Sequence, residues 1–219
     1  VVKFHPQQPS RFAIIPRRGG AQDIRWFEAA PTFVLHWLNA YEEGDEIVLD
    51  GYFQDEPMPR NYEGAPAGYE RMMSYLDQHK MGTHLHRWRF NLRTGETREE
   101  RLSDKIVEFG MINPAYAMRK SRYVWSTTTR PGWFLFNGYV RHDTQTGEEQ
   151  VFQLPEGVYA SESPMIPRKG GTAEDSGYLV TFLIDENTGT SQCAILDASD
   201  VTKGPICRLA LPHQICSGT

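Results

Sequence analysis

Three segments of this chain place a Thr-Gly pair between two runs of strand-forming residues: NLRTGET (91–97), HDTQTGEE (142–149) and DENTGTS (185–191). Glycine adopts the positive φ of a tight hairpin turn at no steric cost, so Gly95, Gly147 and Gly189 each predict a hairpin. These glycines are 52 and 42 residues apart. A strand-hairpin unit that recurs roughly every 40–50 residues is typical of a β-propeller blade.

Alternating β-branched and aromatic residues predict strands along most of the chain. The predicted strands are 11–16, 24–29, 33–42, 46–53, 84–92, 105–112, 122–128, 133–143, 149–155, 178–185, 191–198 and 206–211. Only 68–80, after a loop at 55–68 rich in proline and glycine, carries apolar residues at helical spacing. We therefore predict an all-β fold with one short helix or loop insertion. The blade period fits about four to five propeller blades into the chain, and a β-sandwich is the alternative.

Composition argues against several classes of function. The net charge is -5 with a pI near 5.8, and acidic and basic residues alternate, which does not suit a nucleic-acid-binding surface. No run approaches the ~18 apolar residues of a membrane span, and no signal peptide is recognisable, so a soluble cytoplasmic protein is expected. Cys193, Cys207 and Cys216 have no CxxC spacing and are predicted to be reduced thiols. The chain begins without Met, which favours part of a longer protein.

His36 lies within FVLHWLNAYE (33–42). Strand alternation there predicts Val34, His36 and Leu38 on one face, and Leu35, Trp37 and Asn39 on the other. A histidine between buried apolar neighbours needs either a hydrogen-bond partner or a metal ion. Taken alone, a hydrogen-bonded core histidine is the commoner outcome.

The run HWLNAYE (36–42) resembles the F-x-x-H-x-x-N-A-Y/F-E strand of the carotenoid cleavage oxygenases. Four other parts of the chain resemble that family in the same order. The first is KFHP with PSRFAIIPR (3–17), although His5 replaces an acidic residue, and the second is VEFG through IN (107–113), which is similar to E-F-P-x-I-N. The third is SESPMIP (161–167), which is similar to S/G-E-P-x-F-V-P, and the fourth is the tail 193–219, whose LPHQICSGT resembles V-P-H-R-x-P-Y-G-F.

The resemblance implies that residues 1–219 are the C-terminal portion of a single seven-bladed β-propeller domain, with the N-terminal half of the protein outside this chain. It implies that His36 is the third of four histidines that bind Fe(2+). Glu108 and Glu162 would each accept the Nδ1–H of an iron-bound histidine, which fixes the tautomer that leaves the other nitrogen for the metal. His213 matches a structural histidine of the family and is not expected to be a ligand.

The activity implied by the resemblance is cleavage of a conjugated C=C bond with O2 to give two carbonyl products. The expected substrate is a small apolar or phenolic alkene, either an apocarotenoid or a stilbenoid. Trp37, Phe53 and the 55–68 loop are predicted to contribute to an apolar substrate tunnel. Two alternatives stay open: a non-catalytic propeller scaffold without iron, and isomerohydrolase chemistry, which a membrane-associated branch of the family performs.

The remaining histidines receive simpler predictions. His84 and His86 form an H-x-H pair on a strand, a pattern also seen in cupin-like metal sites. Because no glutamate follows at a ligand offset, we predict a solvated strand face for this pair. His142 is predicted to lie in a hairpin turn without a function.

Overall fold

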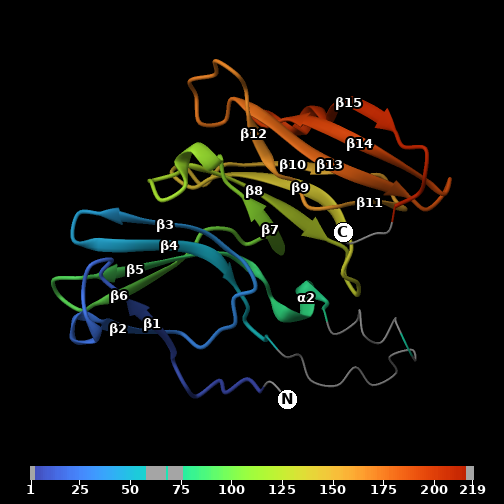
Figure 1. Ribbon diagram of the computed structural model, residues 1–219. Coiled ribbons are helices and arrows are strands. Elements are labelled where there is room, and N and C mark those ends of the chain that lie inside the picture. The colour runs from blue at the N-terminus through green and yellow to red at the C-terminus, as the bar shows by residue number, and fades with distance from the viewer. Residues whose placement is uncertain (1–2, 58–67, 69–75, 216–219) are drawn as a thin grey trace.

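A computed structural model describes residues 3–57, 68 and 76–215. Strands dominate the chain (Figure 1). They are β1 (Ser10–Ile14), β2 (Arg25–Ala29), β3 (Trp37–Glu43), β4 (Glu46–Phe53), β5 (His84–Asn91), β6 (Thr97–Arg101), β7 (Val107–Met111), β8 (Tyr123–Thr129), β9 (Phe136–Asp143), β10 (Glu149–Gln153), β11 (Val158–Ala160), β12 (Met165–Pro167), β13 (Gly177–Asp185), β14 (Thr190–Asp197) and β15 (Pro205–Ala210). One short α-helix, α2 (Gln78–Met81), and 3-10 turns at Ala21–Asp23, Pro114–Tyr116 and Val201–Lys203 complete the described elements.

The strands form a repeated four-stranded unit. Strands β3–β6 pair in sequence order, as do β7–β10, and β12–β15 form a third such meander. Strand β11 joins the second and third units into one sheet by pairing with both β9 and β13, while β1 and β2 form a separate pair. All strand pairs in the described part of the chain are antiparallel, which confirms the all-β prediction.

The described units are fewer than the four to five blades predicted, because the first unit spreads over residues 37–101 rather than 40–50 residues. The described sheets do not form a closed ring. Most of the predicted 55–68 loop and 68–80 helix lies outside the described residues. What is described there is α2, whose N-cap residue Asp77 accepts a hydrogen bond from the His79 N–H at 3.0 Å.

The three Thr-Gly hairpins are confirmed. Gly95, Gly147 and Gly189 have φ of 79°, 77° and 67°. In each turn the glycine N–H donates to the carbonyl four residues earlier, at 2.8–2.9 Å, and the side chain of that earlier residue accepts from a following N–H. The first two hairpins join the third and fourth strands of their units, but the last joins β13 to β14, the second and third strands. This shift explains the unequal spacing.

The β3–β6 sheet is buried on both faces. On one face, Tyr52 and Leu85 pack against Val107, Val124 and Val140 of the second unit. On the other, an aromatic cluster packs against β1 and β2; it contains Phe27, Phe53, Trp88 and Phe90. Burial of each such large apolar side chain stabilises the fold by roughly 1.5–3 kcal/mol. Successive units are therefore fixed relative to one another through the faces of β4 and β5.

This double burial corrects two predictions about histidines. His84 and His86 do not lie on a solvated strand face: they are 3% and 7% exposed and pack against Phe53. The same face of β5 carries Trp88 and Phe90, which pack against Phe12 of β1 and Phe27 of β2, so this face belongs to the core. His142 is in β9 rather than in a turn, and it is 2% exposed.

Two simpler predictions concern the thiols and the membrane. Cys193 and Cys207 are free thiols, as predicted, and Cys216 lies outside the described residues. Within the described residues, no helix has the length and apolar character needed to cross a membrane.

Burial makes His86 a source of acid sensitivity. Within the described residues neither ring nitrogen of His86 forms a hydrogen bond, although Nε2 lies 3.3 Å from Oε2 of Glu99. Burial, with smaller contributions from His84 and Arg101, lowers the pKa of His86 from 6.5 to about 4. The unfolded chain therefore takes up a proton first as the pH falls below 6.5, and stability declines towards pH 4 by up to roughly 3 kcal/mol. Urea unfolding between pH 7 and pH 4 should show a smaller decline for His86→Gln than for the wild type. The exposed His213→Gln variant should match the wild type; equal slopes for His86→Gln would contradict the assignment.

Candidate metal-binding site

The three predicted site residues occupy equivalent places in the three units. His36 immediately precedes β3, Glu108 is the second residue of β7, and Glu162 lies three residues before β12. Each is thus at the start of the first strand of its unit. Because repeated units present their equivalent positions to a common side, side chains from distant parts of the sequence converge there.

A bulge at the start of β3 sets the direction of the His36 side chain. The register of β3 on β4 shifts between Trp37 and Asn39. Leu35 and Trp37 are therefore exposed, whereas Asn39 is 7% exposed, which corrects the prediction that these three share a face. The Asn39 amide donates to the Arg119 carbonyl at 2.7 Å and its oxygen accepts from the Met118 N–H at 2.9 Å. These bonds fix the chain just after His36.

His36 and Glu108 form the central contact of the site. Nδ1 of His36 lies 2.7 Å from Oε2 of Glu108, and the Glu108 side chain is fully buried while that of His36 is 39% exposed. A carboxylate can only accept, so Nδ1 carries the proton and Nε2 keeps its lone pair. No described residue forms a hydrogen bond with Nε2. The ring is thus held through Nδ1, and the lone pair of Nε2 is available to bind a metal ion.

The backbone beside Glu108 is strained in a way that serves this contact. Phe109 has φ of 49°, in the left-handed region that a bulky residue rarely adopts, at a cost of roughly 1–3 kcal/mol. Its N–H donates to Oε2 of Glu108 at 2.5 Å, and its ring lies 4.3 Å from that of His36. The same oxygen therefore holds both the imidazole and the strained peptide, and the phenyl ring limits the rotation of the imidazole.

Electrostatics favour a proton on His36 in the metal-free chain. The hydrogen bond to Glu108 raises the pKa of His36 above 6.5, burial opposes it, and the charges of Glu108 and Glu162 raise it further. Glu162 is exposed and forms no side-chain hydrogen bond within the described residues, yet it lies close enough for its charge to act on the ring. The negative potential that favours a proton here would equally favour a metal cation.

The donor atoms fit a transition-metal ion. An imidazole nitrogen is a good ligand for iron, and a carboxylate on the opposite ring nitrogen is the usual support of a metal-bound histidine. Oε1 of Glu108 is buried and has no hydrogen-bond partner within the described residues. The side-chain hydrogen bonds of Glu108 are therefore those at Oε2, from His36 and Phe109. Within the described residues no group of three His, Cys, Asp or Glu side chains could hold a metal, so further ligands would have to come from elsewhere.

Two residues predicted to contact the substrate belong to the aromatic cluster instead. Phe53 belongs to the aromatic cluster that faces β1 and β2, and Trp37 contacts Trp88 of the same cluster. Their contact with a substrate stays a prediction. His213 is exposed. Sequence reasoning missed Phe109 and Phe134, whose rings lie 5.4 Å apart on the His36 side. The sequence signal that could have indicated Phe109 is its place directly after Glu108 in the VEFG motif (107–110).

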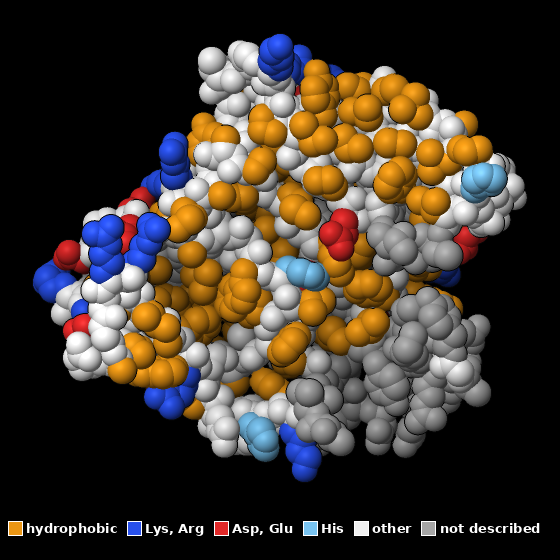
Figure 2. Space-filling view, viewed as in Figure 1, with side chains coloured by type: hydrophobic (Ala, Val, Ile, Leu, Met, Phe, Trp, Pro, Cys, Tyr) orange, Lys and Arg blue, Asp and Glu red, His pale blue; other side chains and the backbone are white. Residues whose placement is uncertain are grey.

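These features define an all-β protein with an imidazole–carboxylate pair suited to a metal ion. Figure 2 shows a face of the molecule on which hydrophobic side chains predominate. A family model described as retinal pigment epithelial membrane protein matches residues 1–219. The chain therefore belongs to this family, that of the carotenoid cleavage oxygenases.

Several members of the family are similar along the whole chain. A carotenoid 9,10(9',10')-cleavage dioxygenase of Crocus sativus is 32% identical over 100% of this chain and 41% of its own length. An isoeugenol monooxygenase of Pseudomonas nitroreducens is 27% identical over 98% of this chain and 46% of its own. The crystal structure of cobalt-substituted Synechocystis ACO superposes with a TM-score of 0.83 and 26% identity, covering 97% of this chain and 43% of that one. The chain thus spans about two fifths of the length of these relatives.

The His36–Glu108 contact makes a prediction for the metal-free chain. Long-range ¹⁵N–¹H NMR spectra should show the neutral ring protonated at Nδ1, because Glu108 accepts that proton. Glu108→Gln should lose this preference, since an amide can donate to the ring as well as accept from it. Glu99→Gln, a carboxylate elsewhere on the sheets, should leave the His36 signals unchanged. A wild-type ring protonated at Nε2 would contradict the geometry.

Proposed function

We propose that this chain supplies part of an Fe(2+) site and that the whole protein cleaves a conjugated carbon–carbon double bond with O2 to give two carbonyl products. The observation that carries the proposal is the 2.7 Å contact between His36 and Glu108 in a chain of this family. The alternative of a non-catalytic scaffold without iron predicts no acceptor beside His36, whereas the Glu108 carboxylate lies there.

The fold supports a position for the site. We propose that residues 1–219 are the C-terminal portion of a single seven-bladed β-propeller, and that the three four-stranded units are three of its blades. Each blade would place the start of its first strand at the axis, where His36, Glu108 and Glu162 begin their units. The remaining histidine ligands and the missing blades would come from outside this chain. A cytoplasmic location remains part of the proposal.

The residues of this chain would have three roles at the site: to bind the metal ion, to orient the histidine rings and to exclude water. Fe(2+), when bound, would activate O2. Nε2 of His36 would bind the metal, and Glu108 would orient the ring by accepting its Nδ1–H. Glu162 would accept the Nδ1–H of a histidine of another blade in the same way. Phe109 and Phe134 would exclude water beside His36 and offer an apolar wall to the alkene.

The names of the relatives support two substrate classes. One relative is named as a carotenoid cleavage dioxygenase, another as an apocarotenoid oxygenase and a third as a monooxygenase of isoeugenol, a phenolic alkene. Long polyenes and phenolic alkenes are both planar and largely apolar, and an aromatic wall suits either. We therefore propose an apocarotenoid or a phenolic alkene as the substrate, with O2 as co-substrate.

Iron analysis of the full-length protein tests the proposal. The wild type should hold one iron per chain and consume O2 in the presence of an apocarotenoid aldehyde or a hydroxystilbene, giving two carbonyl products. His36→Ala should lose the iron and the activity, because one of its ligands is gone. His213→Ala, at an exposed position, should keep both.

Two results would reject the proposal. Stoichiometric iron in His36→Ala would remove His36 from the ligand set. A wild type that takes up no iron after anaerobic loading, and no cobalt either, would favour the scaffold.

A further inference from the structure

A buried chain of polar side chains ends beside the His36–Glu108 pair and has no part in the proposed reaction. It runs from Tyr52 through Ser126 and His142 to Glu149. Tyr52, Ser126 and His142 are all at most 2% exposed. Buried polar groups cost free energy unless they are fully paired. A series of hydrogen-bonded polar side chains between two units is therefore a candidate for a functional role.

Tyr52 contacts both members of the pair through the backbone around them. Its N–H donates to the His36 carbonyl at 3.3 Å. Its hydroxyl lies directly over Gly110, two residues after Glu108, so closely that a Cβ on Gly110 would lie 1.8 Å from the phenolic oxygen. One residue thus fixes the peptide that carries the imidazole and covers the strained Glu108–Gly110 segment that aims the carboxylate.

The polar chain in turn fixes the Tyr52 hydroxyl. The phenolic oxygen lies 2.6 Å from Oγ of Ser126, which lies 3.1 Å from Nε2 of His142, and Nδ1 of His142 lies 2.9 Å from Oε1 of Glu149. Burial raises the pKa of Glu149, but hydrogen bonds from His142 and Ser103 outweigh it and lower the pKa to about 2.

An ionised Glu149 fixes the first bond of this series of polar side chains. The carboxylate accepts from Nδ1–H of His142, which leaves Nε2 of the ring to pair with the Ser126 hydroxyl, and that hydroxyl pairs with the one of Tyr52.

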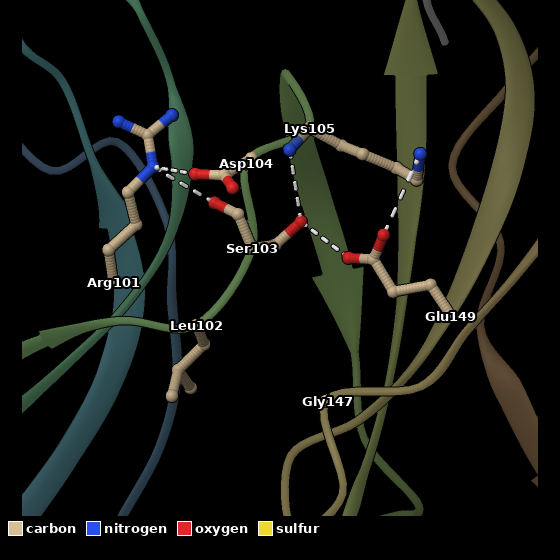
Figure 3. A pocket seen from close by; sticks show the side chains of 7 residues that line it. All are labelled: Arg101, Leu102, Ser103, Asp104, Lys105, Gly147 and Glu149. Atoms are coloured by element: carbon tan, nitrogen blue, oxygen red, sulfur yellow. Dashed lines mark hydrogen bonds and ion pairs between the residues drawn. The ribbon is translucent and has the colours of Figure 1, made fainter.

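The far end of the chain is anchored at the surface. Glu149 lies in a polar pocket of about 350 Å³ with Ser103 and Lys105 (Figure 3). Ser103 donates to Oε1 of Glu149 at 2.5 Å, and Nζ of Lys105 lies 3.6 Å from Oε2. Both partners come from the segment that leads into β7. Glu149 therefore holds the same strand that Tyr52 covers at Gly110.

We propose that Tyr52 is a positioning residue for the His36–Glu108 pair, and that Ser126, His142 and Glu149 hold its hydroxyl over Gly110. This inference rests on the proposed metal site, which it deepens. Its main consequence is that loss of one buried hydroxyl should weaken metal binding without removing any ligand.

Tyr52→Phe tests the inference in the full-length protein, with Co(2+) as the probe. The variant should bind Co(2+) about 10-fold more weakly and alter its visible absorption spectrum, because supports of a metal-bound histidine are typically worth about 10–100-fold in affinity. Tyr139→Phe is the matched control. Tyr139 is 1% exposed and its hydroxyl lies 2.6 Å from Oγ1 of Thr181, which contacts Ser161, so this variant loses a comparable hydrogen bond on the side of Glu162 rather than on that of His36 and Glu108. Both variants should lose similar stability in urea, but Tyr52→Phe should weaken cobalt binding more than Tyr139→Phe does, and only Tyr52→Phe should alter the His36 ring.

Gly110→Ala provides a second, independent measurement. Its new methyl group would collide with the Tyr52 hydroxyl, so the single variant should bind Co(2+) poorly. In a Tyr52→Phe background the closest clash is gone and only Cδ2 of Leu38, at 2.8 Å, and Cζ of residue 52, at 2.9 Å, stay near the new methyl group, so the added loss from Gly110→Ala should be smaller. Equal Co(2+) affinities and spectra for the wild type and Tyr52→Phe, or strictly additive effects of the two substitutions, would overturn the inference.

Metal-free NMR separates this inference from the proposed function. If the wild type binds no Co(2+), the proposed metal site fails, but the positioning role is still read from the His36 Nδ1–H signal. Loss of that signal in Tyr52→Phe and its retention in Tyr139→Phe would support the positioning role. Its retention in both variants would reject it.

Discussion

The hydrogen bond between His36 and Glu108 spans the boundary between two four-stranded units, and the features of the site are arranged around it. Its acceptor is fully buried and its donor is not, so the bond holds a partly exposed ring against a buried carboxylate. An ionised carboxylate in a core is costly unless hydrogen bonds satisfy it. Here Oε2 receives both the imidazole and the Phe109 N–H. The core thus tolerates the charge only while the ring is in place.

The repeat of the fold explains why such distant residues meet. His36, Glu108 and Glu162 are 72 and 54 residues apart in sequence, too far for any local pattern to bring them together. Each begins the first strand of a unit, so the convergence follows from the equivalence of the units. A protein built in this way can gather ligands and their supports from several units while each unit keeps the same strands and turns. The proposed site therefore depends on how neighbouring units pack, and Tyr52 lies in that packing.

Local rules were sufficient for the parts of the fold that local chemistry decides. Gly95 and its two counterparts were recognised as turn residues because positive φ is a property of one residue, and strand β4 was predicted with its observed limits, 46–53. The failures occurred where another sheet decides the outcome. His86 was assigned to a solvated face since alternation shows that a strand has two faces but not what covers each one. Asn39 was assigned to the wrong face because a bulge, which composition does not reveal, shifts the alternation.

The site was predictable only in part for the same reason. The resemblance of motif blocks pointed to His36 and Glu108, and the structure brings them together, but alternation alone left His36 as an ordinary core histidine. The positive φ of Phe109 and the close approach of Tyr52 to Gly110 leave no pattern in the sequence. The positive φ of Phe109 costs free energy in the folded chain, and its N–H bond to Glu108 offsets part of that cost. Because this cost is met on folding, the imidazole is already oriented before any ligand is present, and binding of a cation at the proposed site would require little further ordering of the protein.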